Sequence, residues 1–303
     1  MRTRLSLVPL IAALALTSGC LKKSSESLHE QSQREVQDSA QDKKVSQSPG
    51  ESLATDSSDI AQAMELFYGN YDVKNQTSAA LLPQWRLPAE VPMTVKPLFH
   101  AFYSDAGAGS FVLVTYAVPA NFVGHAAAPT IGIAFLSGTG TTWKIEASNR
   151  AATYAGEWGD PPTGGIELVQ IGPNHHGVKM TDSGGGQGAV TTLMELLVPW
   201  NGMVTVGLKR VVGNNDFGMC DVEGPHLPCF ENHREISFIR DDKAEYYDLK
   251  VELTGTDLVG TDGRNMEARP VNGVEIFKFQ DGGYVSSSHQ GDVTISEDSR
   301  IPK

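Results

Sequence analysis

The sequence predicts a mainly β protein, an antiparallel β-sandwich or barrel-like domain of roughly nine or ten strands with a short N-terminal helix. Three observations lead to this prediction. Many short runs alternate between apolar and polar side chains, which is the period of a strand with one buried face. These runs lie close together in the chain, and glycine, asparagine and proline separate them. The helical crossovers of about a dozen residues that a parallel sheet needs are not found between them.

The elements begin with a helix. Asp59 and Gln62 have the spacing of a capping box, and Gly69 follows as a stop signal. The proline-rich passage 83–97 is expected to be irregular or to form a sheet edge, because proline cannot donate a ladder hydrogen bond. The stretch 111–118 is apolar on both faces, as a central strand would be.

The strongest hairpin signal lies further along the chain. Residues 189–198 and 203–212 flank Asn201-Gly202, a dipeptide that suits the positive φ angles of a two-residue turn. The last core strand is expected at 274–279, with Tyr284 and Val285 near a frayed end. The remaining strands are expected at 131–135, 143–147, 166–171, 177–180, 236–239 and 247–253.

The first twenty residues predict export. Arg2 and Arg4 precede an uncharged stretch, Leu5–Leu16, which as a helix would span about 18 Å, too short for a bilayer core of roughly 30 Å. The stretch is therefore interpreted as a signal peptide. Leu16-Thr17-Ser18-Gly19-Cys20 resembles the lipobox of bacterial lipoproteins, although that family usually has Leu where Thr17 stands. The resemblance implies cleavage before Cys20 and a lipid on its thiol; the alternative is an ordinary signal peptide with an unmodified cysteine.

The same resemblance bears on location. In that family an Asp directly after the cysteine tends to retain the lipoprotein in the inner membrane, whereas this chain has Leu21. The expected location is the cell envelope, with contact to the membrane through the anchor at Cys20. In a Gram-negative cell the resemblance implies the outer membrane, with the domain facing the periplasm or the cell surface.

The chain is expected to have four segments. They are a signal peptide at 1–19, a lipidated cysteine and disordered polar tether at 20–57, a single β-rich globular domain at 58–292, and a flexible tail at 293–303. The tether has no aromatic residue and no apolar period, so it cannot bury enough surface to offset its ordering entropy. Its length gives a typical reach of roughly 30–35 Å.

The three cysteines, Cys20, Cys220 and Cys229, fit this organisation. If Cys20 carries the lipid, an even pair remains, and in an exported chain that pair is expected to form a disulfide. His226 and His233 complete a set of two thiols and two imidazoles that would also suit tetrahedral zinc. The spacing matches no zinc finger or knuckle, and two prolines stiffen the loop. The disulfide is therefore preferred, and no metal is predicted.

Charge and motifs restrict the function. The formal net charge of −12 argues against nucleic acid as a partner, because phosphate binding needs clustered Lys and Arg. The sequence has no nucleophile elbow, P-loop or dinucleotide fingerprint, and no cofactor is predicted. The preferred hypothesis is a tethered domain that binds an envelope protein or a small ligand. One alternative is an envelope hydrolase acting on glycan or peptide, with His175, His176 or Asp182 in its site; another is a structural role in an envelope assembly.

Two further features of the sequence have weaker functional signals. Asp257 and Asp262 have the wrong spacing for a calcium-binding EF-hand loop and are interpreted as solvated loop charges. A tryptophan can stack on a sugar, but packing in the core or a turn is preferred for each, with the loop residue Trp158 as the candidate exception. The four tryptophans are Trp85, Trp143, Trp158 and Trp200.

Lipid attachment can be tested with labelled palmitate. We expect the full chain expressed in a bacterium to incorporate the label and the Cys20→Ala variant to incorporate none, because the thiol is the predicted acceptor. Equal labelling of both chains, or no labelling of the wild type, would reduce the leader to a plain export signal.

Overall fold

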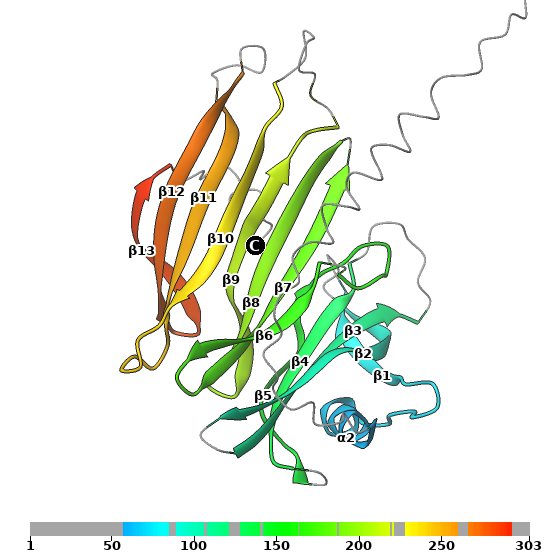
Figure 1. Ribbon diagram of the computed structural model, residues 1–303. Helices are drawn as coiled ribbons and strands as arrows, with labels where there is room; N and C mark the ends of the chain where they lie inside the picture. Colours follow the sequence, from blue (N-terminus) through cyan, green and yellow to red (C-terminus); the bar gives the residue numbers. More distant parts are fainter. Residues whose placement is uncertain are drawn as a thin grey trace, which may run out of the picture. The chain divides into compact units, whose positions relative to one another are not determined.

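The fold is mainly β, as the sequence predicts, with thirteen strands in one mixed, mostly antiparallel open sheet and a helix among the residues described (Figure 1). The computed structural model describes residues 57–84, 89–105, 108–120, 128–139, 142–162, 164–186, 188–218, 220, 228–259 and 266–292. The predicted signal peptide, Cys20, all but the end of the tether, and the tail at 293–303 lie outside these residues. Within the described residues no helix is long and apolar enough to cross a bilayer.

Helix α2 (Ser57–Tyr68) ends where the sequence predicts and begins earlier. Gly69 and Asn70 have φ angles of 74° and 52°, which stop the helix. The helix begins at Ser57, so Asp59 lies in its first turn rather than at a cap. The Asp59 carboxylate instead accepts a hydrogen bond of 2.7 Å from the indole nitrogen of Trp143. The capping-box prediction is therefore wrong, because a tertiary partner competes for the carboxylate.

The first five strands pair antiparallel in chain order. The expected irregular or edge structure is wrong for Pro92 and Pro97, which lie in β2, an interior strand of this group. The register shifts between Pro97 and Phe99, and such an irregularity accommodates a residue that cannot donate to the ladder. These strands are β1 (Ser78–Pro83), β2 (Glu90–Asp105), β3 (Ala108–Pro119), β4 (Thr130–Ser137) and β5 (Lys144–Tyr154).

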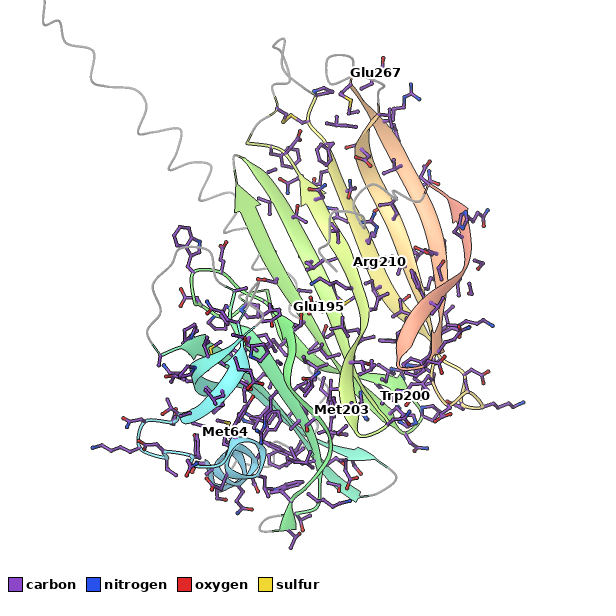
Figure 2. The ribbon with its side chains drawn as sticks, turned by 180° about the vertical axis from the view of Figure 1, so that it is seen from behind. Met64, Glu195, Trp200, Met203, Arg210 and Glu267 are labelled. Atoms are coloured by element: carbon purple, nitrogen blue, oxygen red, sulfur yellow. A yellow bond between two sulfur atoms is a disulfide. The ribbon has the colours of Figure 1, made fainter. Side chains whose placement is uncertain are left out.

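The next eight strands form two groups. The predicted hairpin joins β8 to β9 through Asn201 and Gly202, with φ angles of 50° and 78°; Trp200 and Met203 flank this turn (Figure 2). The first group is β6 (Ile166–Gly172), β7 (His175–Gly186), β8 (Ala189–Trp200) and β9 (Met203–Asn215). The second is β10 (Glu231–Ile239), β11 (Asp248–Val259), β12 (Glu267–Gln280) and β13 (Gly283–Gly291).

Only short stretches of pairing connect these groups. β5 meets β9 in parallel through the single pair Ser148 and Met203. β9 meets β10 antiparallel through three pairs, from Asn215 with Glu231 to Gly213 with His233. Each of the ten strands expected from the sequence coincides with or overlaps an observed strand, and β1, β2 and β13 are additional.

Three clusters of buried side chains stack these groups on one another. In the first, Met64 and Phe67 of α2 pack on one face of β1–β5. In the second, the other face of those strands packs against β6–β9, including Leu197 of β8. In the third, Met194 and Leu196 of β8 pack against β11 and β12. Because neighbouring strand residues point to opposite faces, β6–β9 are covered on both sides.

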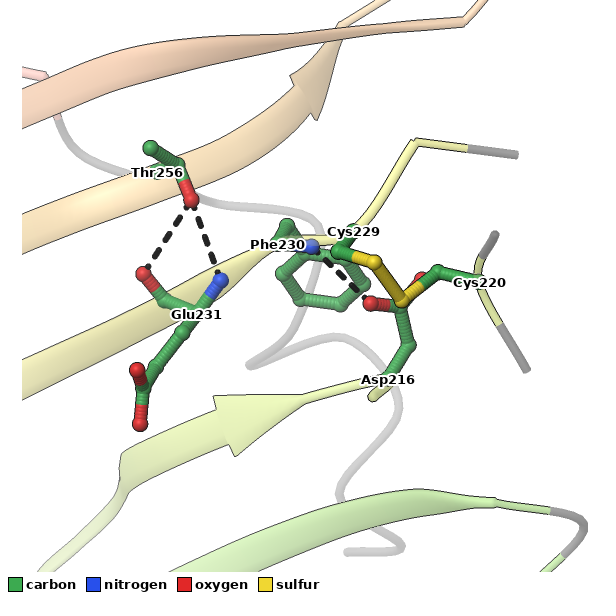
Figure 3. The surroundings of a disulfide bond; sticks show 6 residues. All are labelled: Asp216, Cys220, Cys229, Phe230, Glu231 and Thr256. Carbon is green, nitrogen blue, oxygen red and sulfur yellow. Dashed lines mark hydrogen bonds between the residues drawn. A yellow bond between two sulfur atoms is a disulfide. The ribbon is translucent and has the colours of Figure 1, made fainter. Parts of the chain in front are cut away.

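Cys220 and Cys229 form a disulfide that closes the connection from β9 to β10, with Cα atoms 4.8 Å apart (Figure 3). The buried Asp216 holds both ends of the loop: its carboxylate accepts from the Phe230 amide at 2.9 Å and its carbonyl from the Cys220 amide at 3.1 Å. Both thiols are used in the disulfide, which removes two of the four ligands that a zinc site in this loop would need. His226 lies outside the described residues, and within them no group of His, Cys, Asp and Glu is arranged to hold a metal ion.

The disulfide should contribute to stability. Closing a loop of this length is worth about 2.5–3 kcal/mol in the chain-entropy model. We therefore expect the Cys220→Ser/Cys229→Ser double variant to lower the free energy of unfolding in urea by up to that amount. Wild-type protein in reductant should show the same loss, and the variant should not respond to reductant. An unchanged unfolding curve in the variant would contradict this account.

Candidate functional site

A cavity of about 340 Å³ lies between β6–β8 on one side and β10–β11 on the other. Its volume is near the lower end of the range of small-molecule sites, roughly 300–1,000 Å³. Met194 and Leu196 of β8 and Leu249 of β11, all buried, form its inner end. We call this cavity the lateral cleft; its lining residues are Glu167, Leu168, Val169, Gln170, Lys179, Met194, Leu196, Ile236, Phe238, Arg240 and Leu249.

The cleft exists because two groups of strands separate. After its three pairs with β9, β10 continues with β11 alone, while β9 continues with β8. Where they part, the Arg234 guanidinium donates a hydrogen bond of 2.6 Å to the Val211 carbonyl. At the other end, the Tyr247 amide donates to the Ile171 carbonyl at 2.8 Å. The lateral cleft therefore opens between two fixed ends.

Charged side chains stand at its mouth. Lys179 of β7 forms an ion pair with its cross-strand neighbour Glu167 of β6. Val178 and Met180 point into the second cluster, so Lys179 between them points to the opposite face, toward the cleft. Arg240, directly after β10, is exposed on the opposite wall. The mouth thus carries two cations and one carboxylate.

Aromatic side chains also hold the cleft walls together at the end where the Tyr247 amide bonds the Ile171 carbonyl. His175, the first residue of β7, stacks on Tyr246 with ring centroids 4.4 Å apart and an interplanar angle of 9°. Tyr246 stacks in turn on Phe279 of β12 at 3.8 Å. A side chain at Gly172 would place its Cβ 2.2 Å from the Glu245 carbonyl oxygen, so only glycine permits this approach. The turn and the β10–β11 loop are therefore packed closely together.

A second cavity, of about 250 Å³, contains two of the three predicted hydrolase residues, His175 and His176. The two rings diverge, as expected for neighbours in a strand, because His176 packs on Tyr103 with centroids 4.7 Å apart while His175 packs on Tyr246. We call it the histidine pocket; its lining residues are Tyr103, Ser110, Phe135, Leu136, Ser137, Glu146, Ala147, His175, His176 and Pro199.

Glu146 is the carboxylate of the histidine pocket. The β4–β5 register skips it, since Phe135 pairs with Ala147 and Leu136 with Ile145. Such a bulge re-aims a side chain. The Ser137 hydroxyl donates a hydrogen bond of 2.6 Å to Glu146, and Lys144 lies 3.1 Å away. These two hydrogen bonds lower the pKa of Glu146 below its ordinary value.

The third predicted hydrolase residue, Asp182, is elsewhere. It lies further along β7, roughly 20 Å from the histidines at the rise of an extended strand. Its carboxylate accepts a hydrogen bond of 2.7 Å from the Gly156 amide and so fixes the loop that carries Trp158. The two histidines and Glu146 therefore line one cavity, and Asp182 is not among its lining residues.

The other sequence candidates have mostly structural surroundings. Trp143 is buried and bonded to Asp59, and Trp200 packs edge-on against Phe279. Trp158 is 56% exposed at a φ of 59°. Asp257 accepts a hydrogen bond from the Leu258 amide. Trp85 and Asp262 lie outside the described residues.

Sequence reasoning missed the charged residues of the cleft. Lys179 and Glu167 belong to runs interpreted simply as strands, yet Glu167 places a charge on the face of β6 that it shares with Val169 and Ile171. A charged residue at an inward position of a predicted strand is the signal that the sequence offers. Only the pairing register shows that Glu167 and Lys179 lie opposite each other.

In comparisons with known proteins, no protein-family model, curated protein or solved structure matches the chain.

Proposed function

We propose that this chain is a lipid-anchored protein of the bacterial cell envelope whose β-rich domain binds a small ligand in the lateral cleft. The cleft carries the proposal, because it combines a buried apolar inner end with a few charged groups at an open mouth. That combination is typical of small-molecule sites, in which apolar walls supply affinity and a few polar groups fix orientation.

The anchor and the tether support the envelope part of the proposal. The lipobox-like residues ending at Cys20 provide membrane attachment, and the polar segment behind it provides reach. The disulfide between Cys220 and Cys229 suits an oxidising compartment. In a Gram-negative cell we place the protein at the outer membrane, on the periplasmic side or the cell surface.

The histidine pocket favours a second candidate, an envelope hydrolase acting on glycan or peptide. It gathers imidazoles, hydroxyls and one carboxylate around a single cavity. A serine nucleophile needs a base within hydrogen-bond reach, usually an imidazole. The Ser137 hydroxyl instead bonds Glu146, which is held ionised and itself bonded to Lys144. Binding in the lateral cleft is therefore the better supported function.

Ligand binding can be tested with the neutral dye N-phenyl-1-naphthylamine, whose fluorescence rises in apolar surroundings. The protein used is the mature chain from residue 20 with the Cys20→Ala substitution, because without the proposed lipid anchor it needs no detergent. We expect saturable binding that Ile236→Trp or Val169→Trp reduces at least tenfold, because each fills the lateral cleft from a different wall. The matched control is Ile239→Trp, an exposed position on the same strand as Ile236 and outside the cleft lining.

The result is read together with the far-ultraviolet circular dichroism of each variant. Unchanged dye binding in both cleft variants, with native spectra, would contradict the proposal. So would an equal loss in the Ile239→Trp control.

The hydrolase alternative has its own test. We expect no hydrolysis of peptidoglycan fragments, chromogenic glycosides or casein by the mature chain, and no difference between wild type and His176→Ala. Turnover that His176→Ala or Glu146→Gln reduces by two orders of magnitude, in variants that still bind the dye, would favour the hydrolase.

A further inference from the structure

We infer that the lateral cleft takes an amphipathic anion: a single apolar chain or ring that ends in an acidic head group. This inference rests on the proposed binding function and names its ligand class. It follows from the different chemistry of the two ends of the cleft.

The inner end selects an apolar group. Met194 and Leu196 are each 1% exposed and Leu249 is fully buried, while Val169, Ile236 and Phe238 are half-buried around them. Covering such surface gains roughly 25 cal/mol for each Å² removed from water. A polar group placed there would lose hydrogen bonds to water, because the apolar side chains offer none in return.

The mouth selects a negative charge. Lys179 is already paired with Glu167, and no carboxylate in the described part of the chain forms an ion pair with Arg240. The nearest acid in sequence, Asp241, is held in its own loop, since its carboxylate accepts a hydrogen bond of 2.9 Å from the Lys243 amide. The charged side chains that line the cleft are Lys179, Arg240 and Glu167, so the lining itself carries one excess positive charge on a chain whose formal net charge is −12.

The chemistry of the Arg240 guanidinium and the cavity volume restrict the head group and the size of the ligand further. A guanidinium donates two parallel hydrogen bonds to a carboxylate or a phosphate, so either head group fits. A volume of about 340 Å³ is near the lower limit for ligand pockets and suits one short chain. A cationic amphiphile would meet two cations, and a neutral one would leave Arg240 without a ligand partner.

The test is displacement of N-phenyl-1-naphthylamine from the mature Cys20→Ala chain by matched ten-carbon amphiphiles. We expect decanoate or decyl phosphate to displace the dye at about a tenth of the concentration that decanol requires, a factor typical of one charge-assisted hydrogen bond. Decyltrimethylammonium should need a higher concentration than decanol to displace the dye. The preferred head group, carboxylate or phosphate, is the one whose ten-carbon amphiphile displaces the dye at the lower concentration.

Three variants separate a ligand contact from a structural effect. Arg240→Gln should raise the decanoate concentration needed about tenfold and leave decanol unchanged. Glu167→Gln should lower it, because it removes a negative charge and releases Lys179; a merely structural role would not improve binding. Arg269→Gln, which removes an exposed ion pair with Glu267 on β12 away from the cleft, should change neither.

The two proposals fail differently. If decanol matches the anions and Arg240→Gln has no effect, while Ile236→Trp still abolishes binding, the cleft binds a ligand and the inferred class is wrong. If no amphiphile displaces the dye, or displacement persists in Ile236→Trp and Val169→Trp, the binding function is wrong as well.

Discussion

The constraint on which this fold depends is that strands β6–β9 must bury both of their faces. On β8, Leu197 points to the cluster shared with β1–β5, whereas Leu196 and Val198 point to the cluster shared with β11 and β12. A strand that alternates apolar and polar residues can bury only one face. Because β8 buries both faces, its residues 193–199 form a nearly continuous apolar run. The other two groups of strands pack against the two faces of this one.

Incomplete pairing between β9 and β10 turns this arrangement into a site. Full pairing would continue the sheet and leave no lateral opening, but the ladder stops at Gly213 and His233. The disulfide and Asp216 secure the strand ends beyond the ladder, and Arg234 bridges the strands as they part. These contacts let the two walls diverge without losing their connection, because the separation begins from a covalently closed end. The short ladder therefore leaves open the cavity in which we propose that a ligand binds.

The sequence predicts the strands better than it predicts the site, for physical reasons. Alternation and turn chemistry are local, so the β8–β9 hairpin and the central strands could be read directly. β2 was missed because its prolines argue against an interior strand, and the irregularity that accommodates Pro97 depends on the neighbouring strand. For β13 the sequence predicts only a frayed end, because the residues after Tyr284 lack large apolar side chains apart from Val285, and the structure leaves them exposed. The pairing of Lys179 with Glu167 and the bulge at Glu146 are set by register, which no local pattern encodes.

Two ion pairs on β6–β9 indicate why the charge available to a ligand lies at the cleft mouth and not in the interior. Glu195 of β8 is 3% exposed, and the Lys209 ammonium lies 2.5 Å from it. Since Glu195 and Leu197 are two positions apart on the strand, this carboxylate is on the face of Leu197, away from the cleft. Removing one partner of such a buried pair typically costs about 3–5 kcal/mol, so each charge is committed to the other. Lys179 and Glu167 lie on the opposite face, where water reaches them, and a pair of that kind contributes little to stability. Charges that contribute little to folding can be rearranged around a ligand at little cost, which is why we propose the mouth of the cleft as the place where an anion is recognised.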